Sequence, residues 1–335
     1  MENRFETIYL EKGMYNHSGS TFTGVLESLD PSENYAGTAL EGLDAYQRQL
    51  KRYGIRVKGA GADTVEKFFE NSQTAVLFPE FVSRAVMAGI EADTTLPAVV
   101  AAMSETDGVD FRAISMPSDA VMSVTEGDEI TEAKFVFGDT ATPLNRYGLT
   151  VAASYDTLRN QRLDALAILL GGVGKSLARA YLSDAVKALK ESAETYTIGE
   201  GSIGGTKGKL DYGALIDFWN TFDSCELNTM LVSRDAAVAM LKMTEFQNAA
   251  AGLDFQGTGK LITPLGATLI PCSALEKGEI IGIDHTRALE MVTSPAICVE
   301  TYRLISRRLD RIVVSGAAGF AKLCTDAVKI LKVGA

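Results

Sequence analysis

Residues 171–176 read GGVGKS and end like the glycine-rich loop that wraps the phosphates of a nucleotide. Such a loop requires another glycine five residues before the glycine of its Gly-Lys-Ser end, and it follows a strand. Leu169 occupies that position here, and the residues before it have a helical pattern. The sequence therefore favours a helix in which these glycines permit a bend or close packing, and we expect no cofactor site.

Histidine and cysteine offer little other chemistry. Neither His17 nor His285 lies near a motif that would pair it with a nucleophile, and no Cys-x-x-Cys pair exists. A zinc site needs clustered ligands, and a disulfide framework needs a shorter chain richer in cysteine. We therefore predict no catalytic or metal-binding residues, and four reduced, mostly buried thiols: Cys225, Cys272, Cys298 and Cys324.

Charged residues gather in two places. Acids lie along a strand-like segment, at Glu126, Asp128, Glu129 and Glu132, and arginines lie near the C-terminal end, at Arg303, Arg307, Arg308 and Arg311. The acids are either a solvated face or meet arginines such as Arg307, Arg308 and Arg311 of a neighbouring subunit. The arginine cluster is either a phosphate site or a solvated or ion-paired face, and the acidity of the chain favours the second reading. Exposed ion pairs contribute only about 0–1 kcal/mol each, so such a contact would set orientation more than strength.

Composition excludes several classes of protein. The chain has 335 residues, enough for about two domains, and a net charge of −11, which argues against a basic nucleic-acid-binding surface. Its first residues, MENRFETIYLEKG, do not form a signal peptide. The longest uncharged apolar run, 165–174, is far shorter than the roughly 18–20 residues of a membrane span. We expect a soluble protein made in a cytoplasm.

The longest helical pattern covers residues 154–192 and predicts one helix of about 35 residues, roughly 50 Å long. Its apolar residues recur every three or four positions and so share one face. They are Leu158, Leu166, Leu170, Val173, Leu177, Tyr181 and Ala188. This spine separates two different modules.

Before the spine, residues 1–60 contain one convincing helix, 41–53, and otherwise too few apolar residues to build a core. This segment either stays mobile or gains order by lying on another part of the protein. Pro79 is expected to begin a further helix through Val82, Val86 and Ile90, and residues 109–116 alternate like a strand.

Residues 121–150 read as a long hairpin, with Phe135 and Phe137 on one face of its returning strand. An isolated two-stranded ribbon is at best marginally stable in water. The hairpin is therefore a candidate for contact with another subunit.

After the spine comes a compact α/β module. Asp211 is placed to cap a helix, strands are expected at 227–232, 267–270 and 279–283, and a helix at 235–251 should turn Val238, Leu241 and Phe246 inward. The last segment, 288–331, alternates over a long distance. It predicts long strands that pack back on the spine.

The order of these parts resembles the major capsid protein of tailed bacteriophages, the Hong Kong 97-type capsid fold. The likeness covers about residues 64–331 and lies in the order of several motifs, each weak alone. They are EGDEI at 126–130, AASYDTL at 152–158 before the spine, PLGATLIP at 264–271 and AGFAKL at 318–323.

The resemblance implies an α+β fold. Residues 1–75 would form an N-terminal arm, 121–150 an extended β-hairpin loop, and 206–286 an axial α/β domain. The peripheral domain would combine 76–120 with 151–205, which hold the spine helix, and with the return strands at 287–317. Residues 318–335 would close on the axial domain.

The resemblance also implies a structural protein and not an enzyme. Copies would associate into hexamers and pentamers of an icosahedral shell, in the virion, that encloses double-stranded DNA without sequence-specific binding. A separate scaffolding protein and a portal are the expected assembly partners, and no membrane is. Subunit contacts are expected at Glu126, Asp128, Glu129, Glu132, Lys134, Phe135 and Phe137 of the loop, and at Arg159, Arg162, Arg307, Arg308 and Arg311 of the peripheral domain.

Some members of this family lock the shell through a bond between a loop lysine and an asparagine of the peripheral domain. Lys134 could supply the first group, but no asparagine follows Asn248, so we expect no such cross-link. An encapsulin-type compartment shell is the main alternative function. A nucleotide-dependent enzyme using Lys175 and Ser176, or a tail component of the virion, are weaker alternatives.

Overall fold

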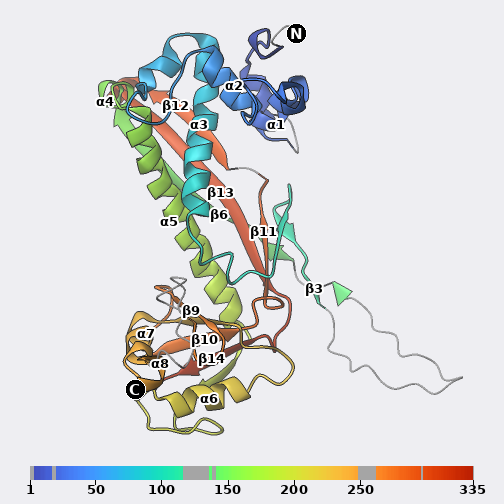
Figure 1. Cartoon of the computed structure of the whole chain (residues 1–335), viewed down its shortest axis with the longest axis vertical. Helices are drawn as coiled ribbons and strands as arrows, with labels where there is room; N and C mark the ends of the chain where they lie inside the picture. The colour runs from blue at the N-terminus through green and yellow to red at the C-terminus, as the bar shows by residue number, and fades with distance from the viewer. Residues whose placement is uncertain are drawn as a thin grey trace, which may run out of the picture.

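The computed structural model describes residues 4–16, 20–115, 136–137, 141–247, 262–295 and 297–334. The molecule is elongated, with two masses joined along one side by the long helix α5 (Leu163–Lys190) (Figure 1). Each mass is built around its own five-stranded sheet, and α5 reaches from one to the other.

The spine is two helices, so the prediction of one continuous helix over 154–192 is wrong. Helix α4 (Tyr155–Arg159) ends before α5, and Arg162 between them has extended backbone. There the backbone pairs with the N-terminal region instead of continuing the helix: Leu163 N donates to Asp63 O at 2.9 Å, and Val65 N donates to Gln161 O at 3.0 Å. The 28 residues of α5 still span about 42 Å at 1.5 Å per residue.

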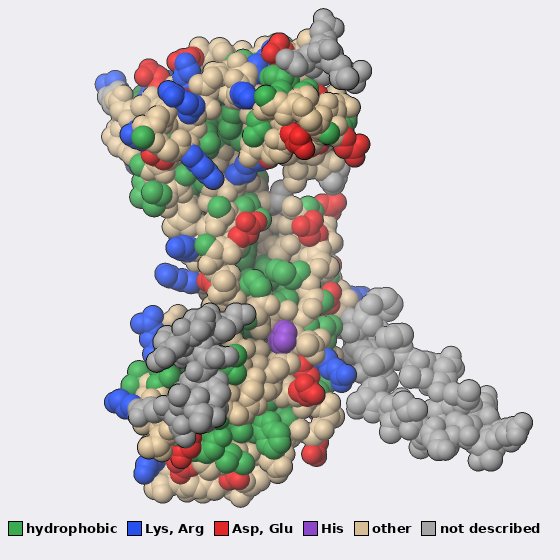
Figure 2. All heavy atoms as spheres, in the orientation of Figure 1, with side chains coloured by type: hydrophobic (Ala, Val, Ile, Leu, Met, Phe, Trp, Pro, Cys, Tyr) green, Lys and Arg blue, Asp and Glu red, His purple; other side chains and the backbone are tan. Residues whose placement is uncertain are grey.

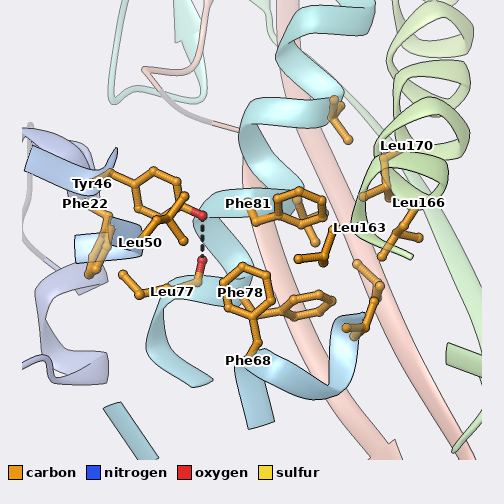
Figure 3. Close-up of a cluster of buried hydrophobic side chains, with 14 of the residues drawn as sticks. Phe22, Tyr46, Leu50, Phe68, Leu77, Phe78, Phe81, Leu163, Leu166 and Leu170 are labelled. Atoms are coloured by element: carbon orange, nitrogen blue, oxygen red, sulfur yellow. Dashed lines mark hydrogen bonds between the residues drawn. The ribbon is translucent and has the colours of Figure 1, made fainter. Parts of the chain in front are cut away.

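The predicted inward face of the spine is confirmed. Its apolar residues Leu158, Leu166, Leu170, Val173, Leu177 and Tyr181 are all buried, and only Ala188 is half-buried. In Figure 3, Leu163, Leu166 and Leu170 approach Phe81 of helix α3 (Ser72–Glu91). The 3.6-residue period therefore placed the core side of the helix correctly.

Helices α3 and α5 approach so closely that their backbones touch through glycines. A Cβ atom on Gly89 would lie 2.1 Å from Gly171 O, and one on Gly174 would lie 2.1 Å from Val86 O. The GGVGKS stretch is thus helix interior with a packing role, as the sequence suggested. Its backbone N–H groups sit within α5 and do not form a loop.

Helix α3 begins at Ser72, and Pro79 lies inside it, so the prediction that Pro79 begins a helix is wrong. Asn71 forms a capping box, accepting from Gln73 N at 3.0 Å and Thr74 N at 2.8 Å. Proline removes one hydrogen bond from a helix interior. Burial of the neighbouring Leu77, Phe78, Phe81 and Val82 offsets that loss.

The N-terminal region lies on α3, which is the second of the two alternatives raised by its composition. It contains short helical elements: η1 (Arg4–Glu6), η2 (Lys12–Asn16), α1 (Phe22–Leu29), η3 (Ser32–Tyr35), α2 (Ala45–Arg52) and η4 (Val65–Phe69). Phe22, Tyr46 and Leu50 join the same apolar cluster as α3 (Figure 3). Tyr46 Oη also donates to Leu77 O at 3.3 Å, so a few well-placed side chains hold the segment down.

The sheet of the upper mass in Figure 1, called the upper sheet, is centred on β13 (Leu309–Lys322). One side of β13 pairs with β6 (Asn145–Ser154), and the other side pairs with β12 (Cys298–Leu304) and then β11 (Leu289–Thr293), which pairs with β1 (Ala102–Glu105). The expected long closing strands are present and pack on α5. Residues 145–150, which the sequence assigned to the end of the extended loop, hydrogen-bond in this sheet.

Four short strands lie beside this sheet. Asp110–Phe111 (β2) pairs antiparallel with Thr142–Pro143 (β5), and Ile114–Ser115 (β3) pairs antiparallel with Val136–Phe137 (β4). The strand expected at 109–116 is thus two short strands. These pairs join residues 110–115, which precede the segment read as a hairpin, to Val136–Phe137 and Thr142–Pro143 of that segment. Its residues 121–135 and 138–140 lie outside the described part of the chain.

The sheet of the lower mass in Figure 1, called the lower sheet, has five strands. Their order across the sheet is β7 (Glu194–Thr197), β14 (Val328–Lys332), β10 (Glu279–Ile283), β8 (Thr229–Val232) and β9 (Thr268–Pro271). Alternate residues face opposite ways: Ile330 packs in the cluster that contains the end of α5, and Leu331 packs in the cluster that contains helices α6 (Tyr212–Asn220) and α7 (Arg234–Leu241). This sheet is therefore covered on both faces.

The helices of this module match the expectations in part. Asp211 caps α6, accepting from Ala214 N at 2.8 Å, as predicted. The helix expected at 235–251 is α7 followed by α8 (Thr244–Gln247), and residues 248–251 lie outside the described part. Phe246 is buried, but Val238 and Leu241 are exposed, so that part of the prediction is wrong. The small Ala236 and Ala237 face the sheet with Met240, which lets α7 approach it closely.

The turn at Asp284 predicts an acid-dependent loss of stability. Its buried carboxylate accepts hydrogen bonds from Thr286 Oγ1 at 2.6 Å and Asn228 Nδ2 at 2.9 Å. Burial raises its pKa, but these bonds and those from the N–H groups of Glu226 and Thr286 outweigh burial, so the net pKa lies below the usual value. A lowered folded-state pKa stabilises the protein above the unfolded-state pKa, about 3.9, and this contribution disappears as pH falls through the folded-state value.

We therefore expect Asp284→Asn to lower the urea midpoint at neutral pH, and the difference from wild type to shrink below about pH 4. Urea unfolding of the unassembled chain across this pH range measures it. A difference that does not change with pH would contradict the assignment of the effect to the Asp284 charge.

Candidate subunit-contact surfaces

Four of the five arginines predicted to contact another subunit lie together at one end of the upper mass. Arg307 and Arg308 are in the exposed turn between β12 and β13, Arg311 is in β13, and Arg159 ends α4. Tyr155 N donates to Arg308 O at 3.3 Å, which joins the start of α4 to that turn. We call Arg159, Arg307, Arg308 and Arg311 the basic tip; Figure 2 shows Lys and Arg side chains at this end.

Two donors in the basic tip are buried without an acceptor. Nη1 of Arg311 donates to Tyr302 Oη at 2.9 Å, but Nε of Arg311 and Nε of Arg159 are buried and have no hydrogen-bond partner in the described part of the chain. An unsatisfied buried donor costs about 1–3 kcal/mol, more when charged. An acceptor that reached either Nε would remove that cost, and the covering side chains would have to move to admit it.

A small pocket adjoins these groups. It has a volume of about 220 Å³ and includes Arg311, Asp310 and Tyr302, with Phe69 and Phe78 supplying an apolar wall. Phe69 and Tyr302 are partly exposed there, at 36% and 44%. The surface therefore combines cations with an accessible aromatic wall.

Arg162, the fifth predicted arginine, is engaged elsewhere. It donates from Nη2 to Gly59 O at 3.0 Å and to Asp164 Oδ2 at 2.7 Å, and from Nε to Asp164 Oδ1. The hydrogen bond from Arg162 lowers the pKa of Asp164, and the same contact raises the pKa of Arg162. Arg162 thus ties the N-terminal region to the start of α5.

The predicted loop contacts are not tested by the structure. Glu126, Asp128, Glu129, Glu132, Lys134 and Phe135 lie outside the described residues. Phe137 is described through its backbone, which pairs with Ile114 in the β3–β4 ladder. These residues remain predictions.

The thiols and His285 occupy structural positions. Nδ1 of His285 lies 2.8 Å from Asn228 Oδ1. Cys225 and Cys272 are buried, and burial raises the pKa of both thiols, which disfavours the reactive thiolate. Cys324 is half-buried, but Cys298 is exposed at the first residue of β12, contrary to the expectation of mostly buried thiols. The described residues contain no group of three His, Cys, Asp or Glu side chains that could hold a metal ion.

Sequence reasoning missed a groove of about 650 Å³ between α2, α3 and α5. Tyr46, Met87, Ile168 and Lys175 line it, and Ile168 is 77% exposed. A signal was present, because Ile168 and Leu169 fall outside the inward face set by Leu166 and Leu170. Apolar residues off the buried face of an amphipathic helix indicate an uncovered contact.

By length and composition α5 could also span a membrane. In this structure, however, its leucine face packs against α3 and β13, as in the core helix of a globular protein.

Comparisons with known proteins agree with this architecture. Residues 138–332, more than half of the chain, match the family model described as phage capsid protein. No curated protein matches the chain by sequence.

Solved capsid and compartment shells share the fold. The capsid of the native GTA particle superposes with a TM-score of 0.55 at 15% identity, covering 72% of this chain and 90% of that one. The capsid protein of cyanophage P-SCSP1u gives a TM-score of 0.52 at 10% identity, covering 72% and 88%. The SrpI encapsulin from Synechococcus elongatus gives 0.50 at 14% identity, covering 72% and 88%.

Identities this low show the fold and nothing more, and the fold is shared by phage capsids and by an encapsulin. The family match extends from the end of the loop segment through α5 to β14, and it includes every strand of the two five-stranded sheets except β1. On that match, and with the arrangement of spine helix, two sheets and paired loop ends described above, this chain belongs to the phage capsid protein family and is a major capsid shell protein of the Hong Kong 97-type fold.

Proposed function

We propose that this chain forms the hexamers and pentamers of an icosahedral shell around the double-stranded DNA of a tailed phage. The family match over residues 138–332 carries this proposal. In it the chain is a structural subunit and not an enzyme, is made in the cytoplasm of a bacterial host, and assembles with a scaffolding protein and a portal. The residue ranges given above for arm, loop, peripheral and axial domains are part of the proposal.

We propose that the shell holds its DNA without sequence-specific contacts. The chain carries a net charge of −11, and tight binding to DNA rises with each phosphate neutralised by lysine or arginine. Exposed cations such as Lys175 and Arg179 on α5 provide only scattered, salt-sensitive contacts.

We further propose that the acidic loop of one subunit contacts the basic tip of its neighbour. Glu126, Asp128, Glu129 and Glu132 supply carboxylates, and the exposed guanidinium groups of Arg307 and Arg308 are suitable donors. Phe135 and Phe137 of the same loop, which follow Lys134 in the sequence, would meet the partly exposed rings of Phe69 and Tyr302 in the pocket at the basic tip.

The double variant Arg307→Glu with Arg308→Glu tests this contact. We expect fewer closed shells at physiological salt, because acidic loops would meet acidic side chains, and partial recovery at high salt, because about 1 M salt shortens the screening length to about 3 Å. Sedimentation and electron microscopy of the chain co-expressed with its scaffolding protein measure the yield.

The control variant Lys12→Glu with Lys51→Glu makes the same charge change at two exposed positions of the N-terminal region, and neither residue lines the pocket beside the basic tip or the groove between α2, α3 and α5. It should assemble like wild type. Equal shell yields from the tip variant and wild type at every salt concentration would disprove the loop-to-tip contact.

Electron microscopy of the purified chain, with and without its neighbouring genes, tests the function itself. Closed angular shells that contain DNA are expected. Shells that contain a protein cargo would support the encapsulin alternative. Rings or tubes would indicate a tail component, and a small discrete oligomer under every condition would overturn the capsid proposal.

A further inference from the structure

Helix α6 of the lower mass has an apolar side that nothing in the described chain covers. Its inner face, Ala214, Leu215 and Phe218, is buried in the module core. On the outer face Ile216 is 41% exposed and Trp219 is 46% exposed. An exposed tryptophan beside an exposed isoleucine is typical of a contact surface, because tryptophan contributes strongly to binding when desolvated.

Helix α7 also exposes two large apolar side chains. Val238 and Leu241 are 51% and 38% exposed, whereas Ala236, Ala237 and Met240 are buried. These two residues lie on the outer face with Arg234 and Lys242, both exposed, one at each end. The outer face of α7 is therefore an apolar pair between two cations.

The stretch of chain that contains α6 has the opposite charge. No lysine or arginine occurs between Leu210 and Ser233, but this stretch contains Asp217, Asp223 and Glu226. Asp223 and Glu226 are exposed just after the C-terminal end of α6. The two outer faces are thus both apolar at the centre and complementary in charge at the edges, an arrangement that favours one partner orientation.

The two helices lie over different parts of the same sheet. Phe218 of α6 contacts Tyr196 of the edge strand β7, with ring centroids 6.3 Å apart, whereas α7 packs against β9 at the other edge. Figure 1 shows them at different edges of the lower mass. A chain with two different, complementary surfaces forms head-to-tail contacts, which close into rings when the rotation between copies permits.

We infer that the outer face of α6 in one subunit packs against the outer face of α7 in the next copy, head to tail, around the symmetry axes of the shell. This inference rests on the proposed function and names the surfaces that join neighbouring subunits. Ile216 and Trp219 meet Val238 and Leu241 at the centre. The acids after α6 meet Arg234 and Lys242 at the rim.

Trp219 is the only tryptophan in the chain, so its fluorescence reports on this surface alone. We expect acrylamide to quench Trp219 readily in unassembled subunits and severalfold less in purified shells, with emission shifted to shorter wavelength. Shells in which Trp219 is as accessible as in free subunits would overturn the inference and leave the proposed function intact. Absence of any shell would overturn the proposed function as well.

A charge exchange tests the pairing of the two faces. Asp223→Lys and Lys242→Glu should each reduce the yield of shells, and the double variant should restore much of it, because opposite charges again face each other. Both positions are exposed, and circular dichroism of the unassembled variants checks that they fold.

Lys332→Glu is the matched control. Lys332 is exposed at the end of β14. It lies two residues after Ile330 in the same strand, so its side chain points to the same face of the sheet, opposite α6 and α7. It should assemble like wild type. A double variant no better than either single variant, or a control as defective as Lys242→Glu, would contradict the α6-to-α7 contact.

Discussion

Replacing Arg48 with methionine is expected to lower the free energy of unfolding by about 3–5 kcal/mol, because it leaves a buried carboxylate without its partner. Arg48 is fully buried, and its Nε donates to Asp30 Oδ2 at 2.9 Å. Its Nη1 donates to Ser32 Oγ at 2.9 Å and to Leu43 O at 2.7 Å, its Nη2 donates to Asp30 O, and the guanidinium lies 4.4 Å from the centre of the Tyr35 ring. One side chain thus joins α1, η3 and α2.

Urea unfolding of the unassembled chain measures the loss, and limited proteolysis should show early cleavage within residues 20–60. Adding Asp30→Asn to Arg48→Met should recover part of the stability, since it removes the unpaired charge and keeps an acceptor for Tyr35 Oη, now 2.7 Å from Asp30 Oδ1.

The exposed pair of Lys67 and Glu70, 3.1 Å apart, supplies the comparison: Lys67→Met should change stability by less than about 1 kcal/mol. If Arg48→Met changed stability no more than Lys67→Met, the Arg48 cluster would not hold the N-terminal region in place.

Adding one methyl group at Gly174 is expected to destabilise the protein by about 3 kcal/mol, at the upper end of overpacking effects. A Cβ there would lie 2.1 Å from Val86 O and 3.0 Å from Gly89 Cα, both backbone atoms of α3. No side-chain rotation can relieve this clash, so Gly174→Ala must move the two helices apart. The cluster formed by Phe78, Phe81 and the α5 leucines would then lose contact.

Gly172 gives a control two residues away in the same helix. A Cβ at Gly172 would meet nothing within 4 Å, and the residue is exposed. Gly172→Ala should therefore stabilise α5 by up to about 1 kcal/mol, through the better helix propensity of alanine. Thermal unfolding of the two variants should shift in opposite directions. A shift in the same direction would show that close α3–α5 packing does not determine the result.

The opposite effects expected at these two glycines show that a match to a sequence motif does not by itself establish the role of each residue in it. Both belong to the stretch that resembles a phosphate-binding loop, yet one permits backbone contact between helices and the other faces solvent. Lys175, the residue that would bind phosphate, lines the groove between α2, α3 and α5 instead. The close packing between α3 and α5 is enough to explain why a glycine occupies position 174.

Local patterns in the sequence were enough to predict the inward face of the spine, the Asp211 cap, the strand 279–283 and the order of parts that resembles a phage capsid protein. Each depends on residues within a few positions of one another, because helix period, strand alternation and capping are local properties. The grouping of Arg307, Arg308 and Arg311 was visible for the same reason.

Tertiary structure decided what depends on residues far apart in the chain. The spine breaks at 160–162 because residues 63–65 hydrogen-bond there, and helix α3 runs through Pro79 because its neighbours are buried against α5 and the N-terminal region. Arg159 joins the basic tip, while Arg162 does not, because β6 brings the start of α4 to the β12–β13 turn. The outward faces of α6 and α7 likewise follow from which side of each helix the sheet covers, and local periodicity alone does not determine that side for short helices.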